Sequence, residues 1–465
     1  MNPWELYAPE LITDLYELTM AESYLREGMN AEATFSLFIR DYPEGRSFFI
    51  SAGIESLLEI LPEFRFSDES LRYLASLGKF STKFLDYLRD FRFSGNIRAI
   101  AEGRIFFVQE PIVEVTAPII EAQIIETLVL NVIQLETMLA SKAARVASVA
   151  SGKGLIEFGM RRTHGVDASL KAARTTYLAG FMGTSNLLAG KIYGIPVFGT
   201  MAHSYITSFH SELDAFYAFV RAFPENPVLL IDTYECIAGA LKAVEVAKEL
   251  RKSGKELSGV RLDSGDLADL SIKVRAVLDQ AGFPDVKIMA SGNLDEYRIE
   301  TLIKSGACID IYAVGTRMSV SADAPYLDIV YKLVEYDNKP VLKLSTGKKT
   351  WPGRKQVDRF YSPDGKMDFD RLRLLEAGIQ EGEPLMELVM KEGQRVNAPE
   401  SLSEIRTRFS GEWRKLPEKL RSIHAAEPYR VEFSQSLREL DSKTARLKRL
   451  EEVEVTKGRL KQKIG

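Results

Sequence analysis

Short apolar runs, each followed by small or polar residues and then by an amphipathic stretch, repeat between residues 155 and 316. This alternation is typical of βα units, in which a buried strand leads through a loop into a helix. The pattern predicts strands at 155–158, 178–182, 196–198, 228–231, 260–262, 286–290 and 309–314. With so many consecutive parallel units, we expect the strands to close into a barrel rather than remain an open sheet.

The stretch between the strands predicted at 260–262 and 286–290 illustrates the helical half of the pattern. Its apolar residues recur on one face of a helix, and they are Leu267, Leu270, Val274, Val277, Leu278 and Ala281. Asp266 precedes them, where the helix dipole favours an acidic side chain. The spacing therefore predicts a helix that begins close to Asp266.

Outside this region the periodicity changes, which indicates a second domain. Helical patterns occur at 11–27, 54–61, 71–77 and 84–88, and strand-like patterns at 33–39, 97–101, 104–108, 329–335 and 341–345. We predict an N-terminal α/β domain over 1–120 and an α/β barrel over 121–330. Residues 331–440 complete the first domain and add a C-terminal segment. The charged tail, 441–465, is expected to be a solvated helix with a frayed end.

Composition and charge narrow the class of protein. The 465 residues include 61 Lys and Arg against 65 Asp and Glu, a formal net charge of −4, and 45% are hydrophobic. This balance excludes a binder of nucleic acid that works through bulk charge, and it excludes disorder for most of the chain. The acidic N-terminal stretch does not resemble a signal peptide, and no apolar run spans a bilayer, so we expect a cytoplasmic protein.

Two cysteines, Cys236 and Cys308, are too few for a disulfide framework or a cysteine zinc site. Both lie in runs that predict buried elements. Any metal ion must therefore be bound by oxygen ligands.

Polar and ionisable residues follow nearly every predicted strand. In chain order they include Arg161, Arg162, His164, Ser185, Thr200, His203, Asp232, Asp263, Gly292, Gly315 and Thr316. The carboxyl ends of the strands carry the active site in α/β barrels, so we expect one common site.

Glycines after the last two predicted strands point to a phosphate site. Gly292 and Gly315, the latter followed by Thr316, allow backbone N–H groups to approach an anion at a helix start. The alternative is that each glycine only turns the chain from strand to helix.

Arg261 and Asp263 alternate along one strand and therefore point to the same face. A charged pair inside a barrel needs a ligand, a metal or a partner, although a satisfied buried ion pair is the alternative. Asp232, Asp263 and Asp266 are oxygen ligands suited to a magnesium ion that also contacts substrate phosphates.

The histidines are His164, His203, His210 and His424. His203 lies in a small, polar loop after a strand, where an acid, base or nucleophile can be presented, and a structural hydrogen bond is the alternative. His424 is expected at the surface. Arg161 and Arg162 offer planar guanidinium groups for a carboxylate or phosphate; the alternative is a surface salt-bridge cluster.

Two classes of function remain at this point. One is an enzyme that acts on a phosphorylated small molecule, and the other is a sugar-phosphate-binding protein without chemistry. Because a binding protein needs no paired acids beside its phosphate site, the acids favour an enzyme.

Seven segments of the chain resemble, in order, the nicotinate phosphoribosyltransferase family of type II phosphoribosyltransferases. They are TDLYELTM (13–20), EFGMRR (157–162), GTMAHS (199–204), VRLDSGD (260–266), SGN (291–293), VGT (314–316) and VYKL (330–333). The resemblance implies an irregular TIM-like α/β barrel with an N-terminal α/β domain, usually in a homodimer. It also implies the first step of NAD biosynthesis from nicotinate, in which 5-phosphoribosyl 1-diphosphate and nicotinate give nicotinate mononucleotide, with magnesium and coupled ATP hydrolysis.

The same resemblance implies roles for individual residues. His203 matches the histidine that ATP phosphorylates, and Asp232 and Asp263 are the candidates for the ribose and magnesium side of the site. Gly292, Gly315 and Thr316 would bind the 5-phosphate. Phe158 and Tyr16, the latter from the partner subunit, would enclose the pyridine ring, while Arg161, Arg261 and Thr200 would contact nicotinate or the phosphoribosyl group.

The related nicotinamide enzyme is the closest alternative within this resemblance. It carries an aspartate in a Lys-Gly-Thr-Asp segment, whereas Ser185 occupies the matching position here. An aspartate would repel the nicotinate carboxylate, and a serine can donate to it, so the acid is favoured as substrate. The shorter quinolinate enzyme is set aside. A binding protein that has lost catalysis is the alternative of a different class.

Overall fold

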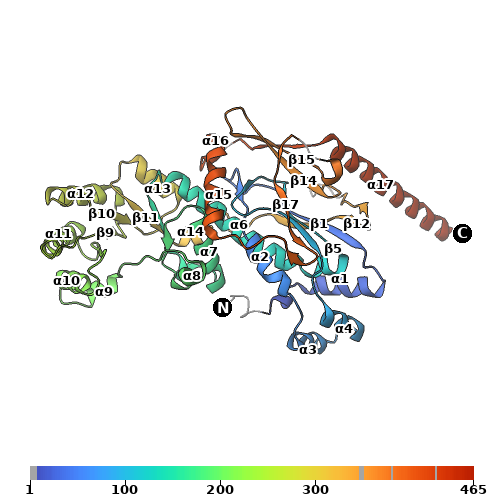
Figure 1. The fold of residues 1–465 in the computed structure, drawn as a ribbon, viewed down its shortest axis with the longest axis horizontal. Coiled ribbons are helices and arrows are strands. Elements are labelled where there is room, and N and C mark those ends of the chain that lie inside the picture. The colour runs from blue at the N-terminus through green and yellow to red at the C-terminus, as the bar shows by residue number, and fades with distance from the viewer. Residues whose placement is uncertain (1–7, 345–349, 379–380, 425–426, 465) are drawn as a thin grey trace. The chain divides into compact units, whose positions relative to one another are not determined.

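The structure, a computed structural model, describes residues 8–344, 350–378, 381–424 and 427–464, with side chains described as far as Glu451. The chain forms two compact units (Figure 1). Unit 1 comprises Met1–Thr137, Tyr326–Leu420 and Ala425–Gly465. Unit 2 comprises Met138–Pro325 and Arg421–His424.

Unit 2 is built on a six-stranded parallel sheet in the order β7-β6-β11-β10-β9-β8. The strands are β6 (Gly154–Glu157), β7 (Gly183–Thr184), β8 (Val228–Leu230), β9 (Gly259–Leu262), β10 (Lys287–Ala290) and β11 (Ile311–Val314). Their residues are mostly buried, as in parallel sheets covered on both faces. The prediction of a mixed α/β fold with parallel strands is confirmed.

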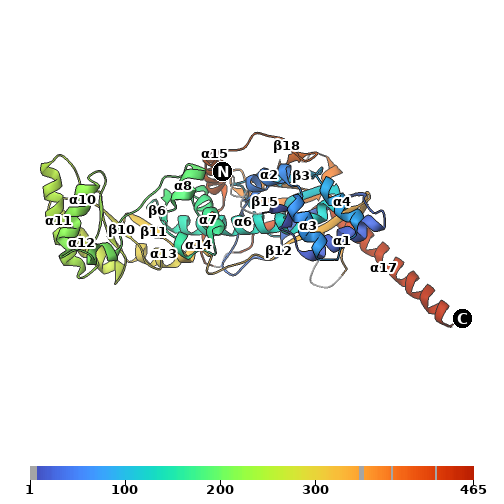
Figure 2. The same ribbon diagram turned by 90° about the horizontal axis from the view of Figure 1, so that it is seen from below.

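Helices connect consecutive strands of this sheet, and one further helix follows the last strand. They are α7 (Val166–Leu178), α8 (Leu187–Tyr193), α9 (His203–Thr207), α10 (Glu212–Ala222), α11 (Cys236–Lys252), α12 (Leu267–Gln280), α13 (Glu296–Lys304) and α14 (Thr316–Ser319). Figure 2 shows α10, α11 and α12 grouped at the same end of unit 2 as β10. The helix predicted after Asp266 is α12, and the Asp266 carboxylate caps it by accepting from the N–H groups of Ala268 and Asp269.

Two of the predicted strands differ from the structure. The strand predicted at 178–182 is wrong: Leu178 ends α7, Gly180 turns the chain with a φ of +111°, and the strand follows at Gly183–Thr184. A short apolar run at a helix end has the same composition as a buried strand, so periodicity does not separate them. The segment predicted at 196–198 contributes one isolated bridge, between Val197 and Thr184.

The hydrogen bonding of the sheet leaves the predicted barrel unconfirmed. Within residues 138–325, all of which are described, β7 and β8 lie at opposite edges of the sheet and are not paired with each other. The bridge at Val197 extends the β7 edge by one residue pair. The observed arrangement is therefore a twisted parallel sheet with helical connections.

Unit 1 contains a seven-stranded sheet in the order β13-β12-β1-β5-β3-β17-β18, a four-stranded sheet in the order β16-β14-β15-β19, and the pair β2-β4. The strands are β1 (Glu32–Ile39), β2 (Phe49–Ile50), β3 (Asn96–Ile100), β4 (Ile105–Phe106), β5 (Pro111–Pro118), β12 (Ile329–Tyr336), β13 (Lys339–Pro340), β14 (Lys355–Tyr361), β15 (Met367–Leu374), β16 (Glu383–Pro384), β17 (Met386–Lys391), β18 (Gln394–Arg395) and β19 (Arg430–Phe433). β1 pairs antiparallel with both β12 and β5, so strands from distant parts of the sequence share one sheet.

The strand predicted at 341–345 is only partly testable. Residues 341–344 are irregular, so the prediction is wrong for them. The strand in this region is β13, which ends at Pro340. Residue 345 lies outside the described residues.

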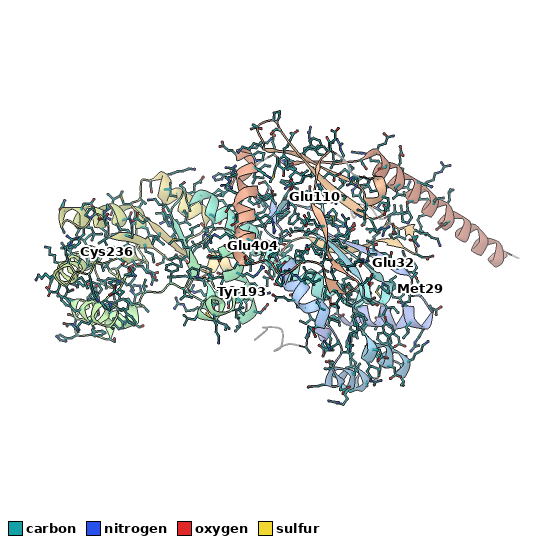
Figure 3. The ribbon with its side chains drawn as sticks, in the orientation of Figure 1. Met29, Glu32, Glu110, Tyr193, Cys236 and Glu404 are labelled. Carbon is teal, nitrogen blue, oxygen red and sulfur yellow. The ribbon has the colours of Figure 1, made fainter. Side chains whose placement is uncertain are left out.

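The helices outside the parallel sheet's connections are α1 (Leu15–Arg26), α2 (Ile54–Ile60), α3 (Asp68–Ser76), α4 (Thr82–Asp90), α5 (Ile119–Ile124), α15 (Leu402–Lys415), α16 (Glu418–Arg421) and α17 (Gln435–Ile464). The first four, α1 to α4, correspond to the four helical patterns in the sequence. The helix α6 (Glu126–Val149) begins in unit 1 and ends in unit 2. Glu404, labelled in Figure 3, closes a capping box with Ser401 at the start of α15.

The charged tail forms a helix, as the sequence predicts. α17 leads away from the sheets of unit 1 to the C-terminus (Figures 1 and 2). Through Glu451, its Leu447 and Leu450 are exposed. His424 is exposed as predicted and lies 3.1 Å from Glu300.

The two cysteines are free, and only one is buried. Cys236, labelled in Figure 3, begins α11, and burial together with nearby acids raises the pKa of its thiol to about 12. Cys308 is half-buried because it lies in the turn before β11, so its predicted burial is wrong. None of the described helices has the length and apolar content needed to cross a membrane.

Candidate active site

Arg261 is the centre of a polar cluster at the carboxyl end of the unit 2 sheet. On β9 its Nε donates to Ser291 Oγ at 2.8 Å, and its Nη2 lies 2.6 Å from Asp263 Oδ1. Nη1 donates to Thr200 Oγ1 at 2.9 Å and to the Met201 carbonyl at 3.1 Å. The Arg261 side chain is 13% exposed, and its guanidinium joins three loops.

Asp263 follows β9 and lies on the same face as Arg261, as the alternation predicts. Besides Arg261, its Oδ1 accepts a short hydrogen bond from the Ser291 hydroxyl. Burial alone would raise the pKa of Asp263. The Ser291 hydroxyl, the Arg261 guanidinium and His203 lower it by more than burial raises it, so the pKa lies below its usual value. The side chain is 30% exposed. Asp263 therefore presents a stable carboxylate to whatever binds there.

His203 begins α9, and its two ring nitrogens have different neighbours. Nδ1 lies 3.1 Å from Thr233 Oγ1, and Nε2 lies 3.7 Å from Asp263 Oδ2. The side chain is 43% exposed. The ring is thus oriented by a hydroxyl on one side and faces a carboxylate on the other.

Asp232 follows β8 and supports the Asp263 loop. Its Oδ2 accepts from the Asp263 backbone N–H at 2.8 Å and from the Ser264 hydroxyl at 2.7 Å. Its Oδ1 is buried and has no hydrogen-bond partner among the described residues. A buried carboxylate oxygen without a donor is costly, so this atom is suited to a cation or a ligand donor.

The two predicted phosphate-site glycines pack against the backbone of the cluster. A Cβ on Gly292, whose φ is +90°, would lie 2.2 Å from the Asp263 carbonyl oxygen, and one on Gly315 would lie 3.1 Å from the Phe158 carbonyl oxygen. The loops that follow β10 and β11 are also joined, since Arg317 Nη1 lies 2.5 Å from Asp295 Oδ2. Thr316 opens α14 beside them.

Phe158 extends β6 and packs on the apolar inner face of the sheet, against Ile156, Met289 and Ala313. The Arg261 guanidinium carbon lies 5.9 Å from its ring centroid, at the outer limit of a cation–π contact. Ser185 follows β7, and its N–H donates to the Glu157 carbonyl at 2.9 Å. Among the described residues the Ser185 hydroxyl has no hydrogen-bond partner.

Arg161 and Tyr16 lie on other elements than the residues of the cluster. Arg161 lies on the exposed 3₁₀ turn Met160–Arg162, without an ion-pair partner among the described residues. Tyr16 lies on α1 of unit 1 and is 47% exposed. Burial and the neighbouring Glu126 and Glu17 raise the pKa of its phenol. The contacts predicted for Tyr16 and Arg161 with the pyridine stay predictions.

Three hydroxyl residues in contact with the cluster were not predicted as site residues: Thr233, Ser264 and Ser291. Each lies within three residues of the carboxyl end of a strand, which is the signal that identified the acids. Hydroxyls are frequent in such loops, so the signal is weak without the geometry.

The cluster offers two carboxylates to a metal ion. Within the described residues, no group of three or more His, Cys, Asp or Glu is arranged as a metal site. Magnesium commonly uses one or two carboxylates together with substrate phosphates, so Asp232 Oδ1 and Asp263 Oδ2 fit that chemistry. The arrangement as a whole combines a fixed cation, two carboxylates and an oriented imidazole.

Comparison with protein families covers most of the chain. Residues 11–134 match the nicotinate phosphoribosyltransferase N-terminal domain, residues 154–362 the nicotinate phosphoribosyltransferase family, and residues 379–441 the nicotinate phosphoribosyltransferase C-terminal domain.

Curated and solved relatives agree with these matches. The chain is 48% identical to the nicotinate phosphoribosyltransferase pncB2 of Mycobacterium tuberculosis, over 89% of each chain. It is 42% identical to the nicotinate phosphoribosyltransferase of Bacillus subtilis, over 75% of this chain and 72% of that one. The crystal structure of human nicotinic acid phosphoribosyltransferase superposes with a TM-score of 0.85 at 29% identity, covering 93% of this chain and 100% of that one. The chain therefore belongs to the nicotinate phosphoribosyltransferase family, whose members transfer a phosphoribosyl group.

Proposed function

We propose that this chain transfers the phosphoribosyl group of 5-phosphoribosyl 1-diphosphate to nicotinate and couples the transfer to ATP hydrolysis through a phosphohistidine at His203. The products are nicotinate mononucleotide and diphosphate, the first step of NAD biosynthesis from nicotinate. One observation carries the proposal: His203 lies beside Asp263, which Arg261 and Asp232 hold at the carboxyl end of a parallel sheet.

The cluster suits the charge that develops during transfer. The pyridine nitrogen attacks C1 of the ribosyl group as the bond from C1 to the diphosphate oxygen breaks, and the sugar passes through a state with oxocarbenium character. A carboxylate such as Asp263 stabilises that positive charge, and the Arg261 guanidinium stabilises the departing diphosphate. Both groups are already oriented by their hydrogen bonds, so little reorganisation is needed.

Substrate binding divides between two sides of the cluster. We assign the 5-phosphate to Gly292, Gly315 and Thr316, because the loops of these residues lie against Asp263 and Phe158. The pyridine ring stacks on Phe158, with Tyr16 on its other face from the partner subunit of a homodimer.

On the pyridine side, the free hydroxyl of Ser185 donates to the nicotinate carboxylate. We assign Arg161 and Thr200 to contacts with nicotinate or the phosphoribosyl group.

Magnesium fits the acidic side of this cluster. Asp232, through its unpartnered Oδ1, and Asp263, through Oδ2, are the residues that would hold it. When bound, the ion supplies positive charge for the diphosphate.

The coupling to ATP uses the exposed imidazole of His203. A ring nitrogen attacks the γ-phosphorus of ATP, the bond from phosphorus to the ADP oxygen breaks, and water later takes the phosphoryl group from the ring as phosphate. The Thr233 hydroxyl orients the ring in both states. A negative charge placed next to Asp263 changes the affinity of the diphosphate side, which links ATP hydrolysis to turnover.

One assay tests the substrate and the reaction together. The protein, magnesium, ATP and 5-phosphoribosyl 1-diphosphate are incubated with nicotinate or with nicotinamide, and the mononucleotide is identified. We expect nicotinate mononucleotide and diphosphate in equal amounts. Nicotinamide mononucleotide as the main product would contradict the assignment of the acid, and absence of diphosphate release with either base would contradict an enzyme.

A variant of His203 tests the coupling separately. We expect His203→Ala to stop substrate-dependent ATP hydrolysis and to remove the enhancement of nucleotide synthesis by ATP. Label from γ-labelled ATP should attach to the wild type and not to the variant. Attachment of label to His203→Ala would refute the phosphohistidine at this position.

A further inference from the structure

Glu157 is a buried carboxylate that the proposed reaction does not use. It is the last residue of β6 and is fully inaccessible to solvent. Within the described residues it has no cationic partner, and burial raises the pKa of its carboxyl despite three hydrogen-bond donors. A carboxylate in an otherwise apolar strand costs stability, so its retention needs a reason in its contacts.

The donors to Glu157 come from three different segments. Oε1 accepts a short hydrogen bond from the Gly159 N–H and a 3.1 Å hydrogen bond from Ser319 Oγ. Oε2 accepts from Thr184 Oγ1 at 2.6 Å. One side chain thus joins the loop after β6, the strand β7 and the helix α14.

Each of these segments carries one side of the proposed site. The loop after β6 holds Phe158, and Ser185 directly follows Thr184, so both lie on the pyridine side. Ser319 belongs to α14, which Thr316 opens on the phosphate side.

The packing at this point leaves little room for adjustment. A Cβ on Gly159 would lie 1.6 Å from Ser319 Oγ and 2.7 Å from Glu157 Oε1. Ser319 Oγ also lies 3.1 Å from the Gly315 carbonyl, and the Phe158 N–H donates to the Val314 carbonyl at 2.8 Å. We call the loop after β6, which holds Phe158, the pyridine loop, and the loop of Gly315 before α14 the phosphate loop. A shift of the pyridine loop must therefore move the phosphate loop.

We propose that Glu157 is a positioning residue that holds the pyridine loop and the phosphate-side helix in one fixed arrangement, so that each substrate binds to a site already aligned for the other. This inference rests on the proposed function, and it adds a group that contacts neither substrate.

The first test is Glu157→Gln, which keeps the shape of the side chain but replaces one acceptor oxygen with an N–H₂ group. Because both loops lose alignment, we expect the KM for nicotinate and the KM for 5-phosphoribosyl 1-diphosphate to rise about fivefold each, with kcat changed less than about twofold. The matched control is Glu212→Gln, a 2% exposed carboxylate of the same unit paired with Lys242 at 2.8 Å. We expect this control to leave both KM values unchanged.

The second test removes the hydrogen bonds of Glu157 one at a time. Ser319→Ala removes the contact to α14 and should raise mainly the KM for 5-phosphoribosyl 1-diphosphate, about threefold. Thr184→Val removes the contact to β7 and should raise mainly the KM for nicotinate by a similar factor. A merely structural role would lower the active fraction, and hence kcat, with both KM values unchanged.

The outcomes separate the two proposals. An active wild type whose Glu157→Gln variant keeps both KM values overturns the positioning role alone. Equal effects of Ser319→Ala and Thr184→Val on both KM values also overturn it, because the two links would then not be specific for one side. A wild type that forms no nicotinate mononucleotide overturns the proposed function and this inference with it.

Discussion

Two arginine clusters, one in each unit, differ in exposure although they use the same chemical groups. In unit 1, Arg359 of β14 donates to Asp370 at 2.6 Å and to Glu412 at 2.9 Å, and the three side chains are 0%, 0% and 5% exposed. In unit 2, Arg261 binds Asp263 at the same 2.6 Å distance, but Asp263 is 30% exposed and its neighbour His203 is 43% exposed.

The difference appears in the titration of the acids as well. Burial, together with the charge of Asp370, raises the pKa of Glu110 well above its usual value in the unit 1 cluster. In the unit 2 cluster, hydrogen bonds from Ser291 and Arg261 outweigh burial and lower the pKa of Asp263. A sealed cluster stabilises the fold, whereas an open cluster with a stable carboxylate remains available to a ligand.

The largest expected effect is on the sealed cluster. Arg359→Ala leaves Asp370 and Glu412 buried without their cation, and we expect the free energy of unfolding to fall by about 3–5 kcal/mol. Urea denaturation measures it. The matched control is Arg371→Ala on β15, whose partner Glu432 is 36% exposed, and it should cost less than about 1 kcal/mol. Similar losses for both variants would contradict the distinction between the clusters.

The second effect concerns the open cluster. Arg261→Ala should lower kcat/KM for nucleotide formation at least about 100-fold, because the guanidinium orients Asp263 and, in the proposed reaction, stabilises the departing diphosphate. We expect the free energy of unfolding to change by less than about 2 kcal/mol, since Asp263 is partly solvated. Steady-state kinetics and urea denaturation of the same preparation measure the two quantities. A loss of stability as large as that of Arg359→Ala would identify Arg261 as a structural group.

A smaller effect is expected at the edge of the open cluster. Ser185→Asp places a negative charge at the position proposed to bind the nicotinate carboxylate, and kcat/KM for nicotinate should fall about tenfold. Ser185→Asn, which is neutral and can donate, is the control and should retain most of the activity. An unchanged kcat/KM for nicotinate in Ser185→Asp would show that discrimination between acid and amide lies elsewhere.

The smallest expected effect is a pH dependence of the stability that Glu110 contributes in the sealed cluster. The pKa of Glu110 is higher in the folded than in the unfolded chain, so its contribution to stability is fully present below its usual value of 4.5 and is lost as the pH rises toward the folded pKa. The stability difference between wild type and Glu110→Gln should therefore fall with rising pH. Urea denaturation of both proteins across this range is the measurement, and a difference that grows with pH would contradict the shift.

The mostly apolar strands of unit 2 were predictable from sequence. The runs at β9, β10 and β11 are bounded by polar loops, and their buried faces admit no other assignment. The run at 178–182 has the same composition, but tertiary packing continues α7 through Leu178. Barrel closure was not predictable either, because it depends on pairing between edge strands rather than on any local pattern.

The site was predictable to the extent that it follows strand ends. That rule identified His203, Asp232 and Asp263, which the structure joins by direct contacts. It missed Thr233, because a hydroxyl becomes informative only when its distance to an imidazole is known. It also does not identify Glu157, the residue with the proposed positioning role, because Glu157 is the last residue of a strand rather than a loop residue. An acid in an apolar run is nevertheless an unusual signal.

The antiparallel pairing of β1 with β12 has a consequence for biosynthesis. A ribosome releases the N-terminal strand early, yet its hydrogen-bonding neighbour is translated only after every strand of unit 2. Until then, one edge of β1 is exposed and open to association with other nascent chains. Fragments that stop before Ile329 should therefore aggregate, and chaperone dependence during translation should end once β12 has emerged.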